Sequence, residues 1–375
     1  MGCEPEATSN KRRKAVKVKL PRGVPPLTSL YLYIAGSCNL ACRHCWIDPR
    51  YQSDGRNGRF LKLKHLGKAI REAKPLGLGS VKLTGGEPVL HPRFREIVEL
   101  IEAEGVDMIM ETNGTLIDDE MAAFLKAKKH FSFVSVSLDG AKPATHDKLR
   151  GVKGSHKKAV AGIRALAKAG FHPQVICTLH KGNVAEMEAL VKLAESLGCD
   201  SVKFNHVQRM GRGDDFAVRN GFRVKELLRL FRRIETRVRP KSGIDIHFDI
   251  PVAFFPIRKL VSGSLPCCHI LNILGILASG DISLCGVGVT VPELVFGNIG
   301  RDRLATVWAT SPKLEEMRRL VPGKFEGVCG RCLHRQTCLG SCIANNYHTG
   351  EKFNAPYFFC YQAESENVFP ATRLL

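Results

Sequence analysis

Residues 36–46 read GSCNLACRHCW and place three cysteines within one short segment. The cysteines have the spacing Cys38-x3-Cys42-x2-Cys45, and the segment follows a run of β-forming residues. Three thiolates on one short loop can occupy three corners of a cubane iron–sulfur cluster and leave the fourth iron open for a substrate or cofactor. A zinc ion that takes His44 as a further ligand is the alternative at this point.

The composition predicts a folded protein with a basic surface. The chain has 375 residues, of which 44% are hydrophobic and 25% are charged, so it can build one large core or two modest ones. Lys and Arg number 56 against 36 Asp and Glu, which gives a formal net charge of +20. This excess indicates an acidic partner such as a nucleic acid, an acidic peptide or an anionic cofactor, or else a basic face that serves solubility.

The amino-terminal segment is basic and polar. Residues 1–27 include the run Lys11–Lys19 and contain no apolar stretch of the length that a signal peptide needs, so we expect a flexible basic tail. No later segment approaches the length of a membrane span. These features predict a cytoplasmic protein without a membrane partner. In a reducing cytosol, clustered cysteines are expected to be metal ligands or redox groups rather than disulfides.

β-rich and helix-like segments alternate over about two hundred residues after the tail. The predicted strands are Leu30–Ala35, Ser80–Leu83, Val106–Met110, Phe133–Leu138, Gln174–Leu179 and Ser201–Asn205. The predicted helices are Lys62–Ala73, Phe94–Glu104, Asp118–Lys128, His156–Ala169, Val184–Ser196 and Val224–Val238. Six βα units predict an α/β fold, a partial, open (βα)6 barrel of parallel strands, with its active site at the carboxyl ends of the strands.

A polar, turn-forming stretch at residues 239–243 marks a predicted boundary. We expect the barrel over residues 28–244 and a small domain held together by metal over residues 245–375. Eight of the fourteen cysteines lie in this second part. They include the series Cys329-x2-Cys332-x5-Cys338-x3-Cys342 with Cys360 after it, and Cys267, Cys268 and Cys285 before it.

The first cysteine motif, placed after the first strand of a βα barrel, resembles the signature of the radical S-adenosylmethionine (SAM) enzymes. The resemblance implies a four-iron four-sulfur cluster held by Cys38, Cys42 and Cys45, whose open iron binds SAM. One electron from the cluster cleaves SAM to methionine and a 5′-deoxyadenosyl radical, which abstracts a substrate hydrogen. Trp46 occupies the aromatic position that follows the third cysteine and would pack near the cofactor.

Loops after three further strands fit the same resemblance. It implies SAM contacts from Gly85, Gly86, Glu87, Pro88, Thr112, Asn113, Ser137, Asp139 and Arg150. A carboxylate or carbonyl of the GGEP loop would receive the SAM ammonium group. Arg150 would either pair with the SAM carboxylate or form a salt bridge that caps a helix. The glycine-containing motif of the fifth strand is not evident in residues 174–180.

The second cysteine series resembles the SPASM domain, which carries two auxiliary four-iron clusters in radical SAM enzymes that mature peptides and proteins. The resemblance assigns an outer cluster to Cys329, Cys332, Cys338 and Cys360. It assigns an inner cluster to Cys268, Cys285 and Cys342, with Cys267 as the fourth ligand or as an alternative to Cys268. The chain would then hold three 4Fe-4S clusters. Cys177 and Cys199 fit no cluster and are expected to be buried as small apolar side chains.

These resemblances imply a radical SAM maturase that abstracts hydrogen from a ribosomally made precursor peptide, giving a crosslink, a thioether, an epimerised centre or an excised fragment. An electron donor such as flavodoxin or ferredoxin and a separate leader-recognition protein are the expected partners. One alternative is a maturase of folded proteins such as sulfatases. In that family an aspartate base follows the cysteine of a Gly-x4-Cys motif, which is Gly280-x4-Cys285 here, whereas this chain has Gly286 at the next position. Modification of a haem-type precursor is a second alternative, and a zinc-ribbon protein that binds nucleic acid is a third.

Overall fold

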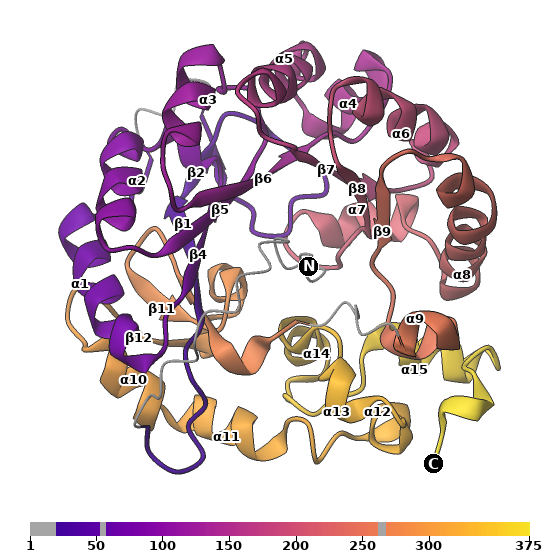
Figure 1. Cartoon of the computed structure of the whole chain (residues 1–375). Helices are drawn as coiled ribbons and strands as arrows, with labels where there is room; N and C mark the ends of the chain where they lie inside the picture. The colour runs from indigo at the N-terminus through magenta and orange to yellow at the C-terminus, as the bar shows by residue number, and fades with distance from the viewer. Residues whose placement is uncertain (1–19, 53–57, 262–267) are drawn as a thin grey trace.

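The computed structural model describes residues 20–52, 58–261 and 268–375, and its central feature is one ten-stranded sheet with helices around the outside (Figure 1). The strand order is β12-β11-β10-β1-β4-β5-β6-β7-β8-β9, and β2 and β3 form a separate pair. The strands are β1 (Ser29–Ala35), β2 (Ser37–Cys38), β3 (Arg50–Tyr51), β4 (Ser80–Gly85), β5 (Asp107–Thr112), β6 (Phe131–Ser137), β7 (Gln174–Leu179), β8 (Ser201–His206), β9 (Asp245–Phe248), β10 (Ile273–Ile276), β11 (Asp281–Ser283) and β12 (Val295–Asn298).

The sheet confirms the predicted α/β fold with an open parallel barrel. The six predicted strands are β1, β4, β5, β6, β7 and β8, and each pairs in parallel with its neighbour. Two short strands extend this parallel set, because β9 pairs with β8 and β10 pairs with β1. The end strands β9 and β12 are not paired with each other among the described residues, so the barrel is not closed.

Helices lie around the outer face of the parallel strands and, in the carboxyl-terminal third, at the open side of the barrel (Figure 1). They are α1 (Leu63–Ala73), α2 (Phe94–Ala103), α3 (Asp119–Lys126), α4 (Pro143–Arg150), α5 (Ser155–Lys168), α6 (Met187–Ser196), α7 (Gly213–Asn220), α8 (Val224–Arg233), α9 (Ile257–Val261), α10 (Leu304–Thr310), α11 (Pro312–Leu320), α12 (Gly327–Arg331), α13 (Arg335–Cys338), α14 (Ile343–Gly350) and α15 (Phe358–Ser365). The six predicted helices correspond to α1, α2, α3, α5, α6 and α8. The sequence prediction missed α4 and α7, which have eight residues each.

Side chains alternate along the strands in the way that a barrel requires. Leu30 and Leu32 of β1 are fully buried in a cluster that also contains Leu66 and Ile70 of α1. Tyr33 belongs to a different, smaller cluster with Leu277. Successive side chains of a strand point to opposite faces, so one face of β1 packs on helices and the other faces the barrel interior.

The segment before β1 is more ordered than the predicted flexible tail of residues 1–27. Residues 1–19 lie outside the described residues. Leu27, in contrast, is fully buried, its N–H donates to the Leu76 carbonyl at 3.0 Å, and the Pro25 carbonyl accepts a hydrogen bond from the Trp308 ring N–H at 2.9 Å. The end of the predicted tail therefore packs on the fold, because its apolar side chain has a place in the core.

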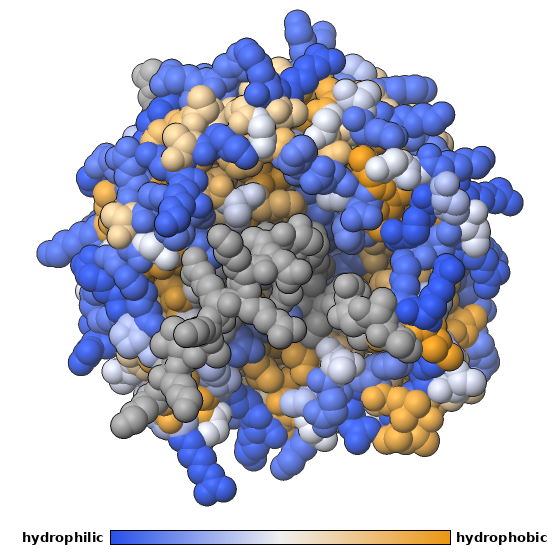
Figure 2. Space-filling view, in the orientation of Figure 1, coloured by the Kyte–Doolittle hydropathy of each residue, from blue (hydrophilic) through white to orange (hydrophobic). Residues whose placement is uncertain are grey.

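The carboxyl-terminal third shares a sheet with the barrel. Its strands β9 and β10 lie at opposite sides of the parallel set, and its helices α10 to α15 gather at the open side of the barrel, drawn from orange to yellow in Figure 1. A boundary at residue 244 stays a prediction. Figure 2 shows hydrophilic residues over most of the rim of this face and apolar residues at recessed places between them. In residues 20–52, 58–261 and 268–375, every helix is too short or too polar to cross a membrane.

Candidate cluster and cofactor site

The three cysteines of the first motif are neighbours at the carboxyl end of β1. Cys38 and Cys42 are buried, and Cys45 is partly exposed. Burial, together with the negative charges of the nearby Glu87, Cys42 and Cys45, raises the pKa of the Cys38 thiol to about 12. Two buried thiols and one partly exposed thiol on one loop, at the strand ends where parallel barrels place their active sites, fit the ligand set of a metal cluster.

The GGEP loop after β4 packs directly on the cysteine loop. The Gly86 N–H donates to the Ala35 carbonyl at 2.7 Å, and the Glu87 N–H donates to the Ser37 carbonyl at 3.0 Å. A Cβ atom on Gly86 would lie 1.9 Å from the Ser37 carbonyl oxygen, so no side chain fits there. Because it has no side chain, Gly86 lets the loop after β4 pack directly on the cysteine loop. The sequence did not indicate how close this contact is.

Glu87 joins the β4 loop to the β5 loop. Its carboxylate is fully buried and accepts hydrogen bonds from the Thr112 hydroxyl at 2.7 Å, the Asn113 N–H at 2.7 Å and the Val89 N–H at 3.3 Å. Burial raises its pKa to about 7, even though these hydrogen bonds act to lower it. Both carboxylate oxygens are engaged within the protein.

Asn113 extends this network to the cysteine loop. Its side-chain amide donates to Asn39 Oδ1 at 2.8 Å and contacts Cys38 Sγ at 3.8 Å. Its own Oδ1 accepts the Thr115 N–H and hydroxyl at 2.9 and 2.7 Å. The amide is therefore fixed in orientation with its N–H₂ group toward the thiol.

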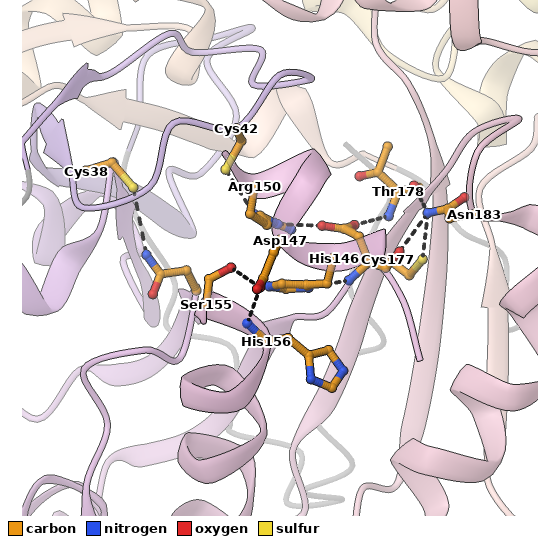
Figure 3. Close-up of polar contacts among 12 residues, drawn as sticks. Cys38, Cys42, His146, Asp147, Arg150, Ser155, His156, Cys177, Thr178 and Asn183 are labelled. Carbon is orange, nitrogen blue, oxygen red and sulfur yellow. Dashed lines mark hydrogen bonds and ion pairs between the residues drawn. The ribbon is translucent and has the colours of Figure 1, made fainter. Parts of the chain in front are cut away.

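Asp139 and Arg150 form a buried ion pair with each other, whereas the sequence resemblance implied two separate contacts to SAM. Asp139 follows β6 and is fully buried, while Arg150 ends α4 and is 9% exposed. Burial acts to raise the pKa of Asp139, but the Arg150 guanidinium, the two histidines His44 and His146, and the Thr178 N–H together outweigh it and hold the pKa at about 2. Arg150 Nη1 also lies 3.6 Å from Cys42 Sγ (Figure 3). Arg150 thus forms a salt bridge with Asp139 rather than one that caps a helix, and its pairing with the SAM carboxylate stays a prediction. Ser137 ends β6 and is half-buried.

Trp46 packs between the cluster loop and the loop after β11. Its ring meets Tyr33 edge to face, with centroids 6.4 Å apart. A Cβ atom on Gly286 would lie 2.5 Å from the Tyr33 hydroxyl and 2.6 Å from a Trp46 ring carbon. The residue after Cys285 therefore has no room for an aspartate. Sequence reasoning missed Tyr33, although its inward position on β1 follows from the alternation of the strand.

Four cysteines of the second series converge from distant parts of the carboxyl-terminal third. Cys329 lies in α12, Cys332 follows it, Cys338 ends α13 and Cys360 lies in α15. All four line one pocket, which also contains Phe325 and Phe369. The charges of the other three act on Cys360, whose pKa is raised by its hydrogen bond with Cys329 and by burial. The structure thus brings the predicted outer ligands together.

Two of the predicted inner ligands are also neighbours. Cys285 is fully buried, which raises its pKa to about 12, and the charge of Cys342 adds to this effect. Cys268 is half-buried and packs against the main core, while Cys267 lies outside the described residues. Cys177 and Cys199 are 1% and 4% exposed, as their expected role as small apolar side chains requires.

Comparison with known proteins agrees with this arrangement. Residues 32–194 match the Radical SAM superfamily, and residues 267–333 match SPASM, an iron-sulfur cluster-binding domain. The chain is a radical SAM enzyme with a SPASM domain. Membership implies bound iron–sulfur clusters and SAM, and the buried thiol groups described above fit this requirement.

Relatives of this radical SAM enzyme have more than one named activity. It is 27% identical over 358 residues to mycofactocin maturase MftC of Mycobacterium tuberculosis, covering 94% of this chain and 88% of the relative. It is 27% identical over 329 residues to the AdoMet-dependent heme synthase of Methanosarcina barkeri, covering 84% and 90%. The fold is similar to Streptococcus suis SuiB bound to its precursor peptide SuiA, with a TM-score of 0.69, 17% identity, and coverage of 90% and 76%.

Proposed function

We propose that this enzyme modifies a ribosomally made precursor peptide by hydrogen abstraction. The observation that carries the proposal is the group of three thiols, the buried Cys38 and Cys42 and the partly exposed Cys45, at the strand ends of an open barrel. With an iron–sulfur cluster and SAM bound, this site supplies the 5′-deoxyadenosyl radical that removes the hydrogen. A flavodoxin or ferredoxin is the expected electron donor, and a separate protein is expected to recognise the leader.

The chain's own residues would hold SAM at the edge formed by β4, β5 and β6. Because the Glu87 carboxylate is already engaged with Thr112 and Asn113, backbone carbonyls of residues 85–88 are the groups left to receive the SAM ammonium. Ser137 is half-buried at the end of β6 and would donate its hydroxyl to SAM. Glu87 would act by fixing the shape of the loop.

The auxiliary groups would hold two further 4Fe-4S clusters. Cys329, Cys332, Cys338 and Cys360 line one pocket and would supply four ligands to one cluster. Cys268, Cys285 and Cys342 are the described members of the second set, for which we propose Cys267 as the fourth ligand or as an alternative to Cys268. Trp46 and Gly286 bring the loop of the first cluster into contact with the loop of the second.

The substrate is expected to carry carboxylates. Lys82 of β4 and Lys203 of β8 are buried at 7% and 3% exposure, and each alternates with side chains of the outer core, so both face the barrel interior. Lys82 lies 3.9 Å above the Tyr31 ring and pairs with Glu111 at 3.2 Å. Because Glu111 already balances the charge of Lys82, the observation that favours an acidic substrate is the net charge of +20.

Two relatives favour different classes of acidic substrate, a peptide and a haem-type precursor. The match to mycofactocin maturase covers 94% of the chain, and the SuiB fold is known with a precursor peptide bound, which supports a peptide. The heme synthase relative is equally identical and supports a haem-type precursor as the second candidate. The sulfatase-type alternative requires an aspartate where Tyr33 and Trp46 enclose Gly286.

Co-expression with the small open reading frames beside its gene, followed by intact-mass analysis of each peptide, tests the proposal. We expect a mass change in one peptide and no change with the Cys42→Ala variant. A mass change that persists with Cys42→Ala would contradict the radical mechanism. Turnover of a haem precursor by the anaerobic enzyme, without any peptide mass change, would establish the second candidate instead.

A further inference from the structure

Arg150 and Asn113 each direct an N–H group toward a thiol of the first motif. The activities named for the relatives assign neither residue a role. Arg150 Nη1 lies 3.6 Å from Cys42 Sγ, and Asn113 Nδ2 lies 3.8 Å from Cys38 Sγ. Arg150 comes from α4 and Asn113 from the loop after β5, so the two donors approach the cysteine loop from separate βα units. Figure 3 shows Arg150 extended toward Cys42.

The Arg150 guanidinium is held in place by a buried anchor. Its Nε donates to Asp139 Oδ2, and the other oxygen of Asp139 accepts the Thr178 N–H at 2.8 Å. The Asn183 amide donates to the Asp139 carbonyl at 2.9 Å, and the Asp139 N–H donates to His146 Nδ1 at 3.1 Å. A fully buried carboxylate with these partners fixes the planar guanidinium in one orientation.

We infer that Arg150, anchored by Asp139, is a positioning residue that donates a hydrogen bond to the Cys42 thiolate and raises the reduction potential of the SAM-binding cluster. Hydrogen bonds to cluster sulfurs are among the features that set such potentials. The reduced cluster carries one more negative charge than the oxidised cluster, so an N–H donor stabilises the reduced form more. The inference rests on the proposed function in one respect, which is that Cys42 ligates this cluster.

Because Arg150 and Asp139 carry opposite charges, removing one or the other should shift the reduction potential of the cluster in opposite directions. Arg150→Met removes the donor and leaves the negative charge of Asp139 uncompensated near the cluster, so the potential should become more negative. Asp139→Asn leaves the positive guanidinium uncompensated beside Cys42, so the potential should become more positive. A purely structural role of the pair would predict loss of the cluster from both variants and no opposite shifts.

The test is a potentiometric titration of the anaerobically reconstituted full chain, followed by electron paramagnetic resonance of the reduced signal that changes on addition of SAM. For Arg150→Met we expect the reduced-to-oxidised ratio at a fixed potential to fall about tenfold, which corresponds to about 59 mV for one electron. Asp139→Asn should shift the ratio in the other direction, and Asn113→Ala should lower it less. Arg150→Lys, which keeps the charge, should restore part of the wild-type value.

Arg93→Met is the matched control, because Arg93 is exposed and forms an ion pair with the exposed Glu96, three residues along the chain. This variant should leave the potential unchanged. A normal potential with weakened SAM binding in Arg150→Met would overturn the inference and return Arg150 to the SAM carboxylate. If Arg150→Met fails to load iron, equal potentials in Asp139→Asn, Arg150→Lys and the wild type would overturn it. The absence of any SAM-responsive signal in the wild type would instead contradict the proposed function.

Discussion

Gly286 and its two aromatic neighbours define the contact between the first cysteine loop and the loop after β11. Tyr33 and Trp46 fill the space that a side chain at this position would need. Burial keeps the Tyr33 phenol neutral by raising its pKa, and the charge of Cys285 adds to this effect. The contact joins Trp46, next to Cys45, to Gly286, next to Cys285, so the two loops cannot move independently.

Gly286→Ala should therefore destabilise the enzyme and impair turnover. The added methyl group must displace a buried tyrosine or Trp46, and overpacking of this kind costs about 1–3 kcal/mol of unfolding free energy. Gly323→Ala is the control, because nothing lies within 4 Å of its Cβ position. Chemical denaturation of both variants measures the difference. Equal stability of the two variants would show that Trp46 moves aside freely.

At the scale of single residues, the sequence predicted which residues lie near the cofactor site better than it predicted their hydrogen-bond partners. The motifs placed Glu87 and Arg150 near the cofactor, and the structure puts both beside the cysteine loop. Their hydrogen bonds could not be predicted, because Thr112 is 25 residues from Glu87 and Asp139 is 11 residues from Arg150. Such pairings depend on how the strand ends meet in space.

At the scale of elements, periodicity predicted the long strands and helices and missed the short ones. The β1 and β7 patterns of apolar residues were sufficient, whereas β9 and β10 have four residues each, too few for a clear period. Their position in the sheet depends on pairing with β8 and β1. The carboxyl-terminal helices depend in turn on contacts such as that between β8 and α15.

His206 makes this contact sensitive to pH. It ends β8, is 5% exposed, and packs against Phe358 with ring centroids 5.6 Å apart. Burial lowers its pKa to about 4, although the charge of Asp249 acts to raise it. The neutral ring therefore stabilises the fold fully above pH 6.5, and this stabilisation is lost as the pH falls towards 4.

The unfolding free energy of the wild type should thus decrease between pH 6.5 and 4 by about 3 kcal/mol from this residue. His206→Phe should remove that part of the decrease, while His172→Phe, at an exposed position, should not. Chemical denaturation at several pH values measures both. An unchanged pH dependence in His206→Phe would contradict the burial argument.

At the scale of the whole molecule, three groups of thiols lie in one continuous fold. The resemblance found in the sequence grouped Cys329, Cys332, Cys338 and Cys360, and the structure brings Cys360 from α15 into the same pocket as the other three. The inner group is less complete, because Cys267 lies outside the described residues and adjacent cysteines in the sequence do not reveal which of them binds.

Iron analysis tests this arrangement as a whole. The anaerobically reconstituted enzyme should contain about twelve iron atoms per chain, from three clusters of four. Cys338→Ala should lose about four of them, since it removes one ligand of the outer group, while Cys199→Ala should lose none because Cys199 is a buried side chain outside all three groups. Stoichiometric zinc with little iron would contradict the cluster assignment and favour a zinc-ribbon protein.

The central claim is that Cys38, Cys42 and Cys45 together form the site of SAM cleavage. Its most direct test is the formation of 5′-deoxyadenosine from SAM by the anaerobic, reduced enzyme, compared between the wild type, Cys42→Ala and Cys177→Ala. We predict 5′-deoxyadenosine with the wild type and with Cys177→Ala, whose thiol lies in β7 outside the three groups, and none with Cys42→Ala. Continued cleavage by Cys42→Ala, or none by the fully iron-loaded wild type, would contradict the account.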